Sequence, residues 1–195
     1  MKRSNERTML CILAGGLSQR MGRDKSRLRL GRQTLVSHLR ATLKDSDWPV
    51  RVLRRDIVDR CGPLGGIYTA LRTTRAEVVI FLACDMPFVS VAWLHRLRRG
   101  LRKKDGAVFT LLGSKVGFPL LLRVNTLAVV KEQLAARQFS LQNLSMHTSA
   151  RRMGQPKSTK KGESFNINTL EDWQRALKSA EIARSKDFQT FAQPF

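Results

Sequence analysis

A short apolar segment near the start of the chain is followed at once by two adjacent glycines. Residues 9–12 (MLCI) form the apolar run, and Gly15 and Gly16 follow it after Leu13 and Ala14. Such a run is typical of a buried strand, and the glycines allow the backbone to turn tightly or to approach a ligand closely. The order of strand and glycine turn therefore predicts an α/β protein whose turn either binds phosphate groups or simply reverses the chain.

Polar and basic residues follow the two glycines. Ser18, Arg20 and Lys25 would supply hydrogen-bond donors and positive charge to bound phosphates. The segment is not a P-loop, because five residues separate Gly16 from Gly22 and Arg-Asp precedes the lysine, and it lacks the dinucleotide pattern GxGxxG. The residues themselves are equally consistent with a loop for a nucleoside triphosphate and with a plain tight turn.

Strand-like and helix-like segments alternate along the rest of the chain. This alternation predicts one α/β domain over residues 1–183, with a mostly parallel sheet flanked by helices and a loosely held tail over 184–195. We also expect a polar loop over residues 151–163. The expected strands are 9–12, 51–53, 77–83, 107–112 and 120–123, and the expected helices are 33–43, 65–72, 91–104, 126–136 and 171–183.

The chain is strongly basic. Its 36 Lys and Arg residues outnumber 15 Asp and Glu residues, which gives a formal net charge of +21. Such a charge attracts nucleotides, phosphorylated cofactors or nucleic acid, or it belongs to a surface adapted to its solvent. The single Tyr and the aromatic content of 7% argue against nucleic acid, because few side chains are present on which bases can stack.

Cysteine number and hydropathy favour a cytoplasmic protein. The three cysteines, Cys11, Cys61 and Cys84, are widely spaced and odd in number, which argues against a disulfide framework and a zinc site. No apolar run is long enough to cross a bilayer, so we expect no membrane association.

Four motifs follow one another along the chain: the glycine loop at 13–25, GPLGGI at 62–67, ACDMP at 83–87 and FNINTLED at 165–172. In this order they resemble the motifs of the molybdenum cofactor guanylyltransferases, a family of nucleotidyltransferases with a Rossmann-like, glycosyltransferase-A-like fold. The resemblance spans roughly residues 8–177 and identifies residues 1–183 as a nucleotidyltransferase domain.

The resemblance implies that GMP is transferred from GTP to the phosphate of molybdopterin, with Mg²⁺ as cofactor and pyrophosphate as the second product. In the family pattern Lys25, Arg20 and Asp85 are catalytic, and Asp85 binds the metal. GTP and the molybdenum cofactor are then the small-molecule partners, and molybdoenzymes or other proteins of cofactor biosynthesis are candidate protein partners.

The same resemblance implies that the nucleotide contacts the end of the first strand, the glycine loop and the carboxylates of Asp56 and Asp85. Asp85 ends an apolar strand, where ligands of α/β sheets gather, although a strand-end Asp also caps helices. Asp56 has the spacing expected for a nucleotide contact, while Asp59 is a rival and simple solvation of the surface is the third reading. The implied nucleotide-binding residues are Leu13, Ala14, Gly15, Gly16, Lys25, Asp56 and Asp85.

The acceptor would lie beside the late motif. Asn166 and Asn168 alternate in a strand-like stretch and so share one face, although either Asn also suits a local turn. The resemblance assigns these two residues to the acceptor, together with Arg20 and Gly22. Residues 137–138 occupy a region in which the family often has basic residues facing the acceptor, but Phe139 weakens that match.

The chain departs from the family pattern between the first helix and the GPLGGI motif. Only residues 44–61 fill this interval, so a second strand and its connection are missing. Because that region helps to hold the base in the family, we expect weakened selection among nucleotides. Two alternatives to guanylyltransfer therefore stay open: transfer to another phosphorylated acceptor, of cytidylyl or sugar-phosphate type, and nucleotide binding without catalysis.

Overall fold

The computed structural model describes residues 6–15, 28–59, 61–155, 166–167, 169 and 171–178. Its strands are β1 (Thr8–Leu13), β2 (Arg29–Leu30), β3 (Gln33–Thr34), β4 (Val50–Leu53), β5 (Val78–Ala83), β6 (Ala107–Leu112), β7 (Lys115–Arg123) and β8 (Ala150–Gly154). Its helices are α1 (Leu35–Thr42), α2 (Pro63–Arg72), α3 (Val91–Gly100), α4 (Leu127–Ala135) and α5 (Leu141–His147), and residues 171–178 form a further helix. Short 3-10 turns follow α1 and precede α4 (Leu43–Asp45 and Val124–Thr126).

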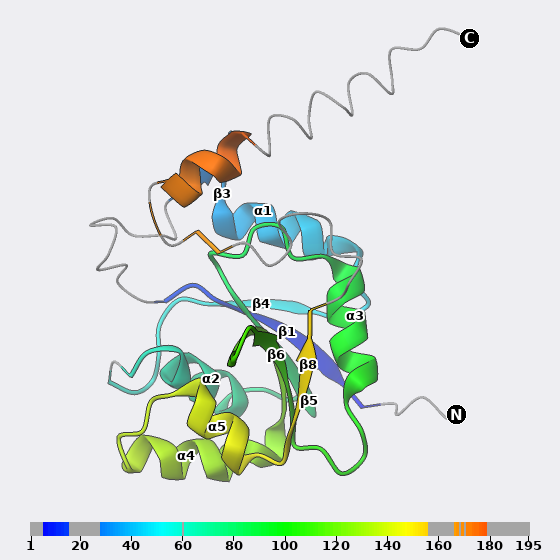
Figure 1. The fold of residues 1–195 in the computed structure, drawn as a ribbon, viewed down its shortest axis with the longest axis vertical. Coiled ribbons are helices and arrows are strands. Elements are labelled where there is room, and N and C mark those ends of the chain that lie inside the picture. Colours follow the sequence, from blue (N-terminus) through cyan, green and yellow to red (C-terminus); the bar gives the residue numbers. More distant parts are fainter. Residues whose placement is uncertain are drawn as a thin grey trace, which may run out of the picture.

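Six strands form one sheet in the order β4-β1-β5-β7-β6-β8 (Figure 1). All of them run in one direction except β7, which is antiparallel to both β5 and β6. The expected α/β fold with a mostly parallel sheet is therefore confirmed. None of the described helices is long and apolar enough to span a bilayer.

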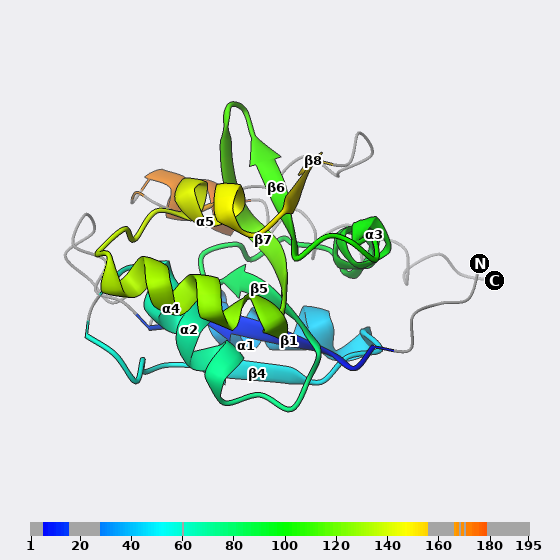
Figure 2. The ribbon, with the colours of Figure 1, turned by 90° about the horizontal axis from the view of Figure 1, so that it is seen from below.

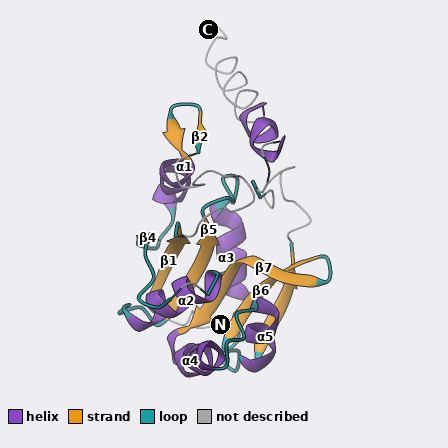
Figure 3. Ribbon diagram, turned by 90° about the vertical axis from the view of Figure 1, so that its left-hand side faces the viewer, coloured by secondary structure: helices purple, strands orange, loops and turns teal. Residues whose placement is uncertain are grey.

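Helices cover both faces of the sheet, which explains why its central strand is apolar throughout. In β5, Val79 and Phe81 pack toward α2, α4 and α5, whereas Ile80 and Leu82 pack toward α1 and α3. Side chains alternate across a strand, so a strand buried on both faces needs a continuous apolar run. Figures 2 and 3 show α1 and α2 on opposite sides of β1.

The sequence-based boundaries of several elements need correction. The polar loop expected over 151–163 begins as strand β8, because its residues pair in parallel with β6. Strand β8 contains two consecutive arginines, so its sequence lacks the alternation of apolar and polar residues that is typical of a strand. Helix α5 was not expected at all, and α3 ends at Gly100 rather than at residue 104, because Leu101 has extended backbone angles. Residues 179–195, with the predicted tail, lie outside the described part.

A small apolar cluster joins the segment after the glycine loop to the end of the chain. Its buried members come from residues 28–35 and from the late motif and its helix: Leu28, Leu30, Leu35, Ile167 and Ala176. Trp173 packs against this cluster, and its indole Nε1 donates a hydrogen bond of 3.0 Å to the carbonyl oxygen of Arg29. Segments about 140 residues apart in sequence are thereby held together.

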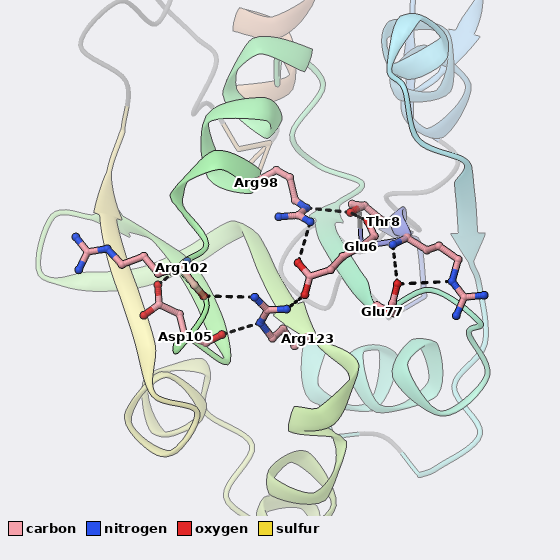
Figure 4. Close-up of polar contacts among 8 residues, drawn as sticks. Glu6, Thr8, Glu77, Arg98, Arg102, Asp105 and Arg123 are labelled. Carbon is pink, nitrogen blue, oxygen red and sulfur yellow. Dashed lines mark hydrogen bonds and ion pairs between the residues drawn. The ribbon is translucent and has the colours of Figure 1, made fainter. Parts of the chain in front are cut away.

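An ion-pair network fixes the opposite, amino-terminal end of β1 (Figure 4). Glu6 forms ion pairs with Arg98 of α3, at 3.0 Å, and with Arg123 of β7. Arg98 Nε also donates to Thr8 Oγ1 at 3.0 Å, and Arg123 Nε donates to the carbonyl oxygen of Asp105 at 2.9 Å. Burial lowers the pKa of both arginines. The network anchors α3 and β7 to the first strand.

Candidate functional site

Three parallel strands end together and place three sequence motifs at one edge of the sheet. Leu13 at the end of β1 lies opposite Leu53 of β4 and Ala83 of β5. The ladder continues beyond the strands, because Ala14 N donates to Leu53 O at 2.8 Å and Cys84 N donates to Leu13 O at 3.2 Å. Ligands of open α/β sheets bind at this carboxyl edge, so we locate the candidate site here.

Gly15 stands where two backbones approach closely. A Cβ at this position would lie 3.0 Å from the carbonyl oxygen of Arg54, so a larger residue would push the chains apart. The start of the glycine loop therefore runs alongside the residues that follow β4. Leu13 and Ala14 lie at the same strand end, as expected, whereas Gly16, Ser18, Arg20, Gly22 and Lys25 fall outside the described residues.

The carboxyl group of Asp56 lies against the first turn of α2. A Cβ on Gly65 would be 2.8 Å from Asp56 Oδ2, and a Cβ on Gly66 would be 3.4 Å from its Oδ1. Although the residue as a whole is exposed, partial burial of the carboxyl group raises its pKa. Thr69 Oγ1 holds the neighbouring backbone, because it accepts a hydrogen bond of 3.0 Å from Ile57 N. The GPLGG segment thus makes room for a carboxylate.

Cys61 is a member of the site that sequence reasoning did not select. A Cβ on Gly65 would lie 2.9 Å from Cys61 Sγ, so the thiol and the Asp56 carboxyl flank the same glycine. Burial raises the pKa of the Cys61 thiol, and the negative charge of Asp56 raises it further. The thiol is therefore neutral near pH 7. Gly62 before α2 has a φ of +65°, which explains the glycine there.

Asp85 and the late motif meet at the end of β5. Ile167 N donates a hydrogen bond of 2.9 Å to the backbone carbonyl of Asp85, and Ile167 itself is fully buried. The neighbouring Asn166 has a buried Oδ1 that has no hydrogen-bond partner among the described residues. The structure therefore places Asn166 next to a residue that is bonded to the backbone of Asp85, which the sequence analysis did not predict. Asn168 lies outside the described residues.

At the carboxyl ends of the strands, the side chains that could bind a cation would do so through oxygen atoms. Within the described ranges no cluster of three or more His, Cys, Asp or Glu residues exists that would enclose a metal by itself. The Asp85 carboxylate and the unpaired Asn166 Oδ1 are hard oxygen donors of the kind that Mg²⁺ prefers. Because Mg²⁺ usually keeps waters and substrate phosphates as ligands, one carboxylate and one amide fit it.

The connection between α4 and α5 lies on the same side of the molecule as the carboxyl ends of β1 and β4 (Figures 1 and 2). Buried Gln133 holds it, because its Nε2 donates to the carbonyl oxygens of Gln138 and of Ser140. Arg137 has a positive φ of 55°, and Phe139 is 39% exposed. Both side chains are exposed on this side of the molecule.

Comparison with known proteins agrees with this arrangement. A family model described as the MobA-like NTP transferase domain matches residues 10–56 and 44–146. A probable molybdenum cofactor guanylyltransferase of Opitutus terrae is 34% identical over 149 residues, which cover 67% of this chain and 74% of that protein. The molybdenum cofactor guanylyltransferase of Syntrophotalea carbinolica is 30% identical over 185 residues, covering 84% of this chain and 88% of the relative.

Solved structures support the same fold. The molybdopterin-guanine dinucleotide biosynthesis protein A of Archaeoglobus fulgidus superposes with a TM-score of 0.74 at 17% identity, covering 89% of this chain and 98% of that one. The 2-C-methyl-D-erythritol 4-phosphate cytidylyltransferase of Thermus thermophilus gives 0.66 at 14% identity, covering 89% and 98%.

The two pieces of the family match overlap at residues 44–56, within the interval where a strand was expected to be missing. The loss of that strand stays a prediction. In the structure β4, which lies in that interval, pairs directly with β1 and is the edge strand of the described sheet. From the family match and the relatives, the chain belongs to the MobA-like NTP transferase family.

Proposed function

We propose that this protein transfers GMP from GTP to the phosphate of molybdopterin and releases pyrophosphate. The observation that carries the proposal is the convergence of Gly15, Asp56 and Asp85 at the ends of three adjacent parallel strands, with Asn166 beside Asp85. The names of the relatives from Opitutus and Syntrophotalea supply the reaction, and the charge of +21 suits two anionic substrates.

In the proposed reaction an oxygen of the molybdopterin phosphate attacks the α-phosphorus of GTP. A bond forms between that oxygen and the phosphorus, and the bond from phosphorus to the bridging oxygen of the β-phosphate breaks, with its electron pair leaving on pyrophosphate. The nucleophile is already anionic, so no side chain has to remove a proton. Positioning and neutralisation of charge are the main tasks of the protein.

Each task has a proposed residue. Asp85 and Asn166 would hold Mg²⁺, which when bound neutralises the charge that develops on the triphosphate. Lys25 and Arg20 would bind the phosphates, and the close approach of Gly15 to Arg54 would bring backbone groups to the nucleotide. Asn168 and Gly22 would contact the acceptor with Asn166. The reaction takes place in the cytoplasm in this proposal.

A panel of acceptors tests the proposal. Pyrophosphate release is measured with GTP and Mg²⁺ in the presence of molybdopterin, of hexose 1-phosphates or of buffer alone, and each reaction is repeated with CTP. Release that requires both GTP and molybdopterin supports guanylyltransfer. Release with a hexose 1-phosphate instead identifies another acceptor, and the overlap at residues 44–56 is the observation that favours including this alternative.

A further inference from the structure

Helix α3, the turn after it and strand β8 form a surface on which positive charge is concentrated. We call this surface the cationic face; it consists of Arg96, Arg99, Arg102, Lys103, Lys104 and Arg151. Arg152 lies on the other face of β8, where it bonds Ser145 of α5. Asp105 is the only acidic residue in segments 91–105 and 150–155. Asp105 is 7% exposed, and its Oδ2 accepts a hydrogen bond from the backbone N–H of Arg102.

The two elements of the cationic face are fixed to each other. Arg151 Nη1 donates to the carbonyl oxygen of Gly100 at 2.8 Å, and Arg96 Nη1 donates to the carbonyl oxygen of Gly154 at 3.1 Å. Met153 packs so closely on Gly100 that a Cβ there would lie 2.2 Å from its sulfur. Helix and strand therefore lie side by side, as Figure 1 shows, and present one preformed surface.

Most charges on this face have no structural task in the fold. Arg98, on the same helix, is used internally because it binds Glu6, and the guanidinium of Arg102 points away from that network (Figure 4). Arg99, Lys103 and Lys104 are likewise exposed. Like charges placed close together repel one another, so such a cluster is best explained by an anionic partner that offsets the repulsion.

The position of β8 as an edge strand indicates the conformation of the partner segment. Strand β8 is the last strand of the described sheet, and edge strands offer backbone groups for a further strand. Arg151 bonds toward α3, whereas Arg152 bonds Ser145 of α5 at 3.1 Å, so the two arginines lie on opposite faces of β8. An added strand with carboxylates at successive positions would meet a cation on each face.

We propose that the cationic face docks an extended, acidic segment of a partner protein along β8. A nucleic acid fits less well, because Trp93 is the only Phe, Tyr or Trp in segments 91–104 and 150–155 and is 2% exposed, which leaves bases nothing to stack on. The inference does not depend on the proposed transferase activity, because none of its residues belongs to the candidate site.

Two variants with equal net charge test the proposal. The first carries R99S, R102S and K103S on the cationic face together with R152S on the other face of β8, and the control carries R32S, R40S, K44S and R72S at exposed positions elsewhere. Binding is measured by fluorescence anisotropy with a fluorescein-labelled peptide of repeated Glu-Glu-Val, in a buffer of physiological ionic strength. An oligothymidylate of matched charge is titrated in parallel, and circular dichroism checks the fold of both variants.

We expect the first variant to lose about tenfold or more in peptide affinity, because several charge pairs disappear together. The control should lose less than about threefold, since distant charges are screened within ~8 Å at this ionic strength. Equal losses in the two variants would overturn the proposal, because the total charge would then suffice. Tighter binding of the oligothymidylate, lost in the first variant alone, would also overturn it in favour of a nucleic-acid surface.

Discussion

The backbone amide of Ile167 donates a hydrogen bond to the backbone carbonyl of Asp85, and the two atoms are 2.9 Å apart. This bond joins motifs that are about 80 residues apart in sequence. Its position explains why a late asparagine belongs to the same site as a carboxylate at the end of the central strand. The apolar cluster around Ile167 supports the bond from behind, since Ile167 is fully buried.

Trp173 is expected to position the segment that follows the glycine loop. Trp173→Phe keeps a six-membered aromatic ring but removes the five-membered ring with the N–H that bonds the carbonyl oxygen of Arg29, and its matched control removes the same atoms. The loss should lower the free energy of unfolding by about 1 kcal/mol and raise the KM for GTP more than it changes kcat. The matched control is Trp48→Phe, which alters a ring contact with His95 on another helix. An equal rise of KM in the control would contradict this role.

Asp56→Asn should stabilise the free protein and weaken nucleotide binding. The folded-state pKa of Asp56 is raised by burial, so its ionisation stabilises the unfolded state relative to the folded one. The stability that its protonated form contributes is present below the unfolded pKa of about 3.9 and is lost as pH rises through the folded pKa. The asparagine avoids this loss near pH 7.

Thermal unfolding with and without GTP measures both effects of Asp56→Asn. We expect a higher Tm without ligand and a smaller shift of Tm on addition of GTP, because the nucleotide loses a contact. The same substitution at exposed Asp59 is the control, and it should change neither quantity. A full GTP-induced shift in the Asp56 variant would remove Asp56 from the nucleotide site.

Lys25→Ala should weaken the binding of GTP far more than that of guanosine. The ammonium group of a lysine attracts phosphates and has no partner on an uncharged nucleoside. Isothermal titration calorimetry with both ligands gives the comparison, and Arg32→Ala is a control for the removal of one positive charge. Equal losses for the two ligands would assign Lys25 a structural role.

The contraction between residues 44 and 61 should relax selection of the base. Phosphate contacts carry no information about the base, so affinity for triphosphates should persist while GTP, CTP and ATP compete on similar terms. Exposed Arg54 and Arg55, which follow β4, would strengthen the grip on phosphates, and this contribution should fall steeply with salt. Competition titrations at low and high salt test this, and a strong GTP preference that survives high salt would show a rebuilt base pocket.

The central part of the fold could be predicted because its signals are local. The apolar run that forms β5 indicates a strand buried on both faces. The glycines after β1 indicate a close approach of two backbones. Strand β8 could not be predicted, since its sequence ARRMG lacks apolar alternation and it forms only through pairing with β6. Propensity gives way to tertiary pairing at such an edge strand.

The positions of two predicted site residues were accessible from the sequence. Asp85 was selected because it ends an apolar strand, and Asp56 because of its spacing before Gly62. Both follow strands that end at the same edge of the sheet, and their roles in binding stay predictions. Cys61 was missed because its place beside Asp56 depends on how α2 begins, which a single sequence does not reveal. The direct pairing of β4 with β1 likewise does not follow from any local pattern in the sequence.

The transfer of GMP itself is tested most directly by product analysis. The protein is incubated with molybdopterin, GTP and Mg²⁺, and mass spectrometry follows the pterin while pyrophosphate is quantified in the same sample. Asp85→Asn serves as a matched control that should keep the fold and lose the metal-dependent reaction. We predict that the wild-type protein forms a guanine dinucleotide of the pterin and an equal amount of pyrophosphate. The Asp85→Asn variant should form neither product. Unchanged molybdopterin and no pyrophosphate, in a sample that still binds GTP, would contradict the proposed activity.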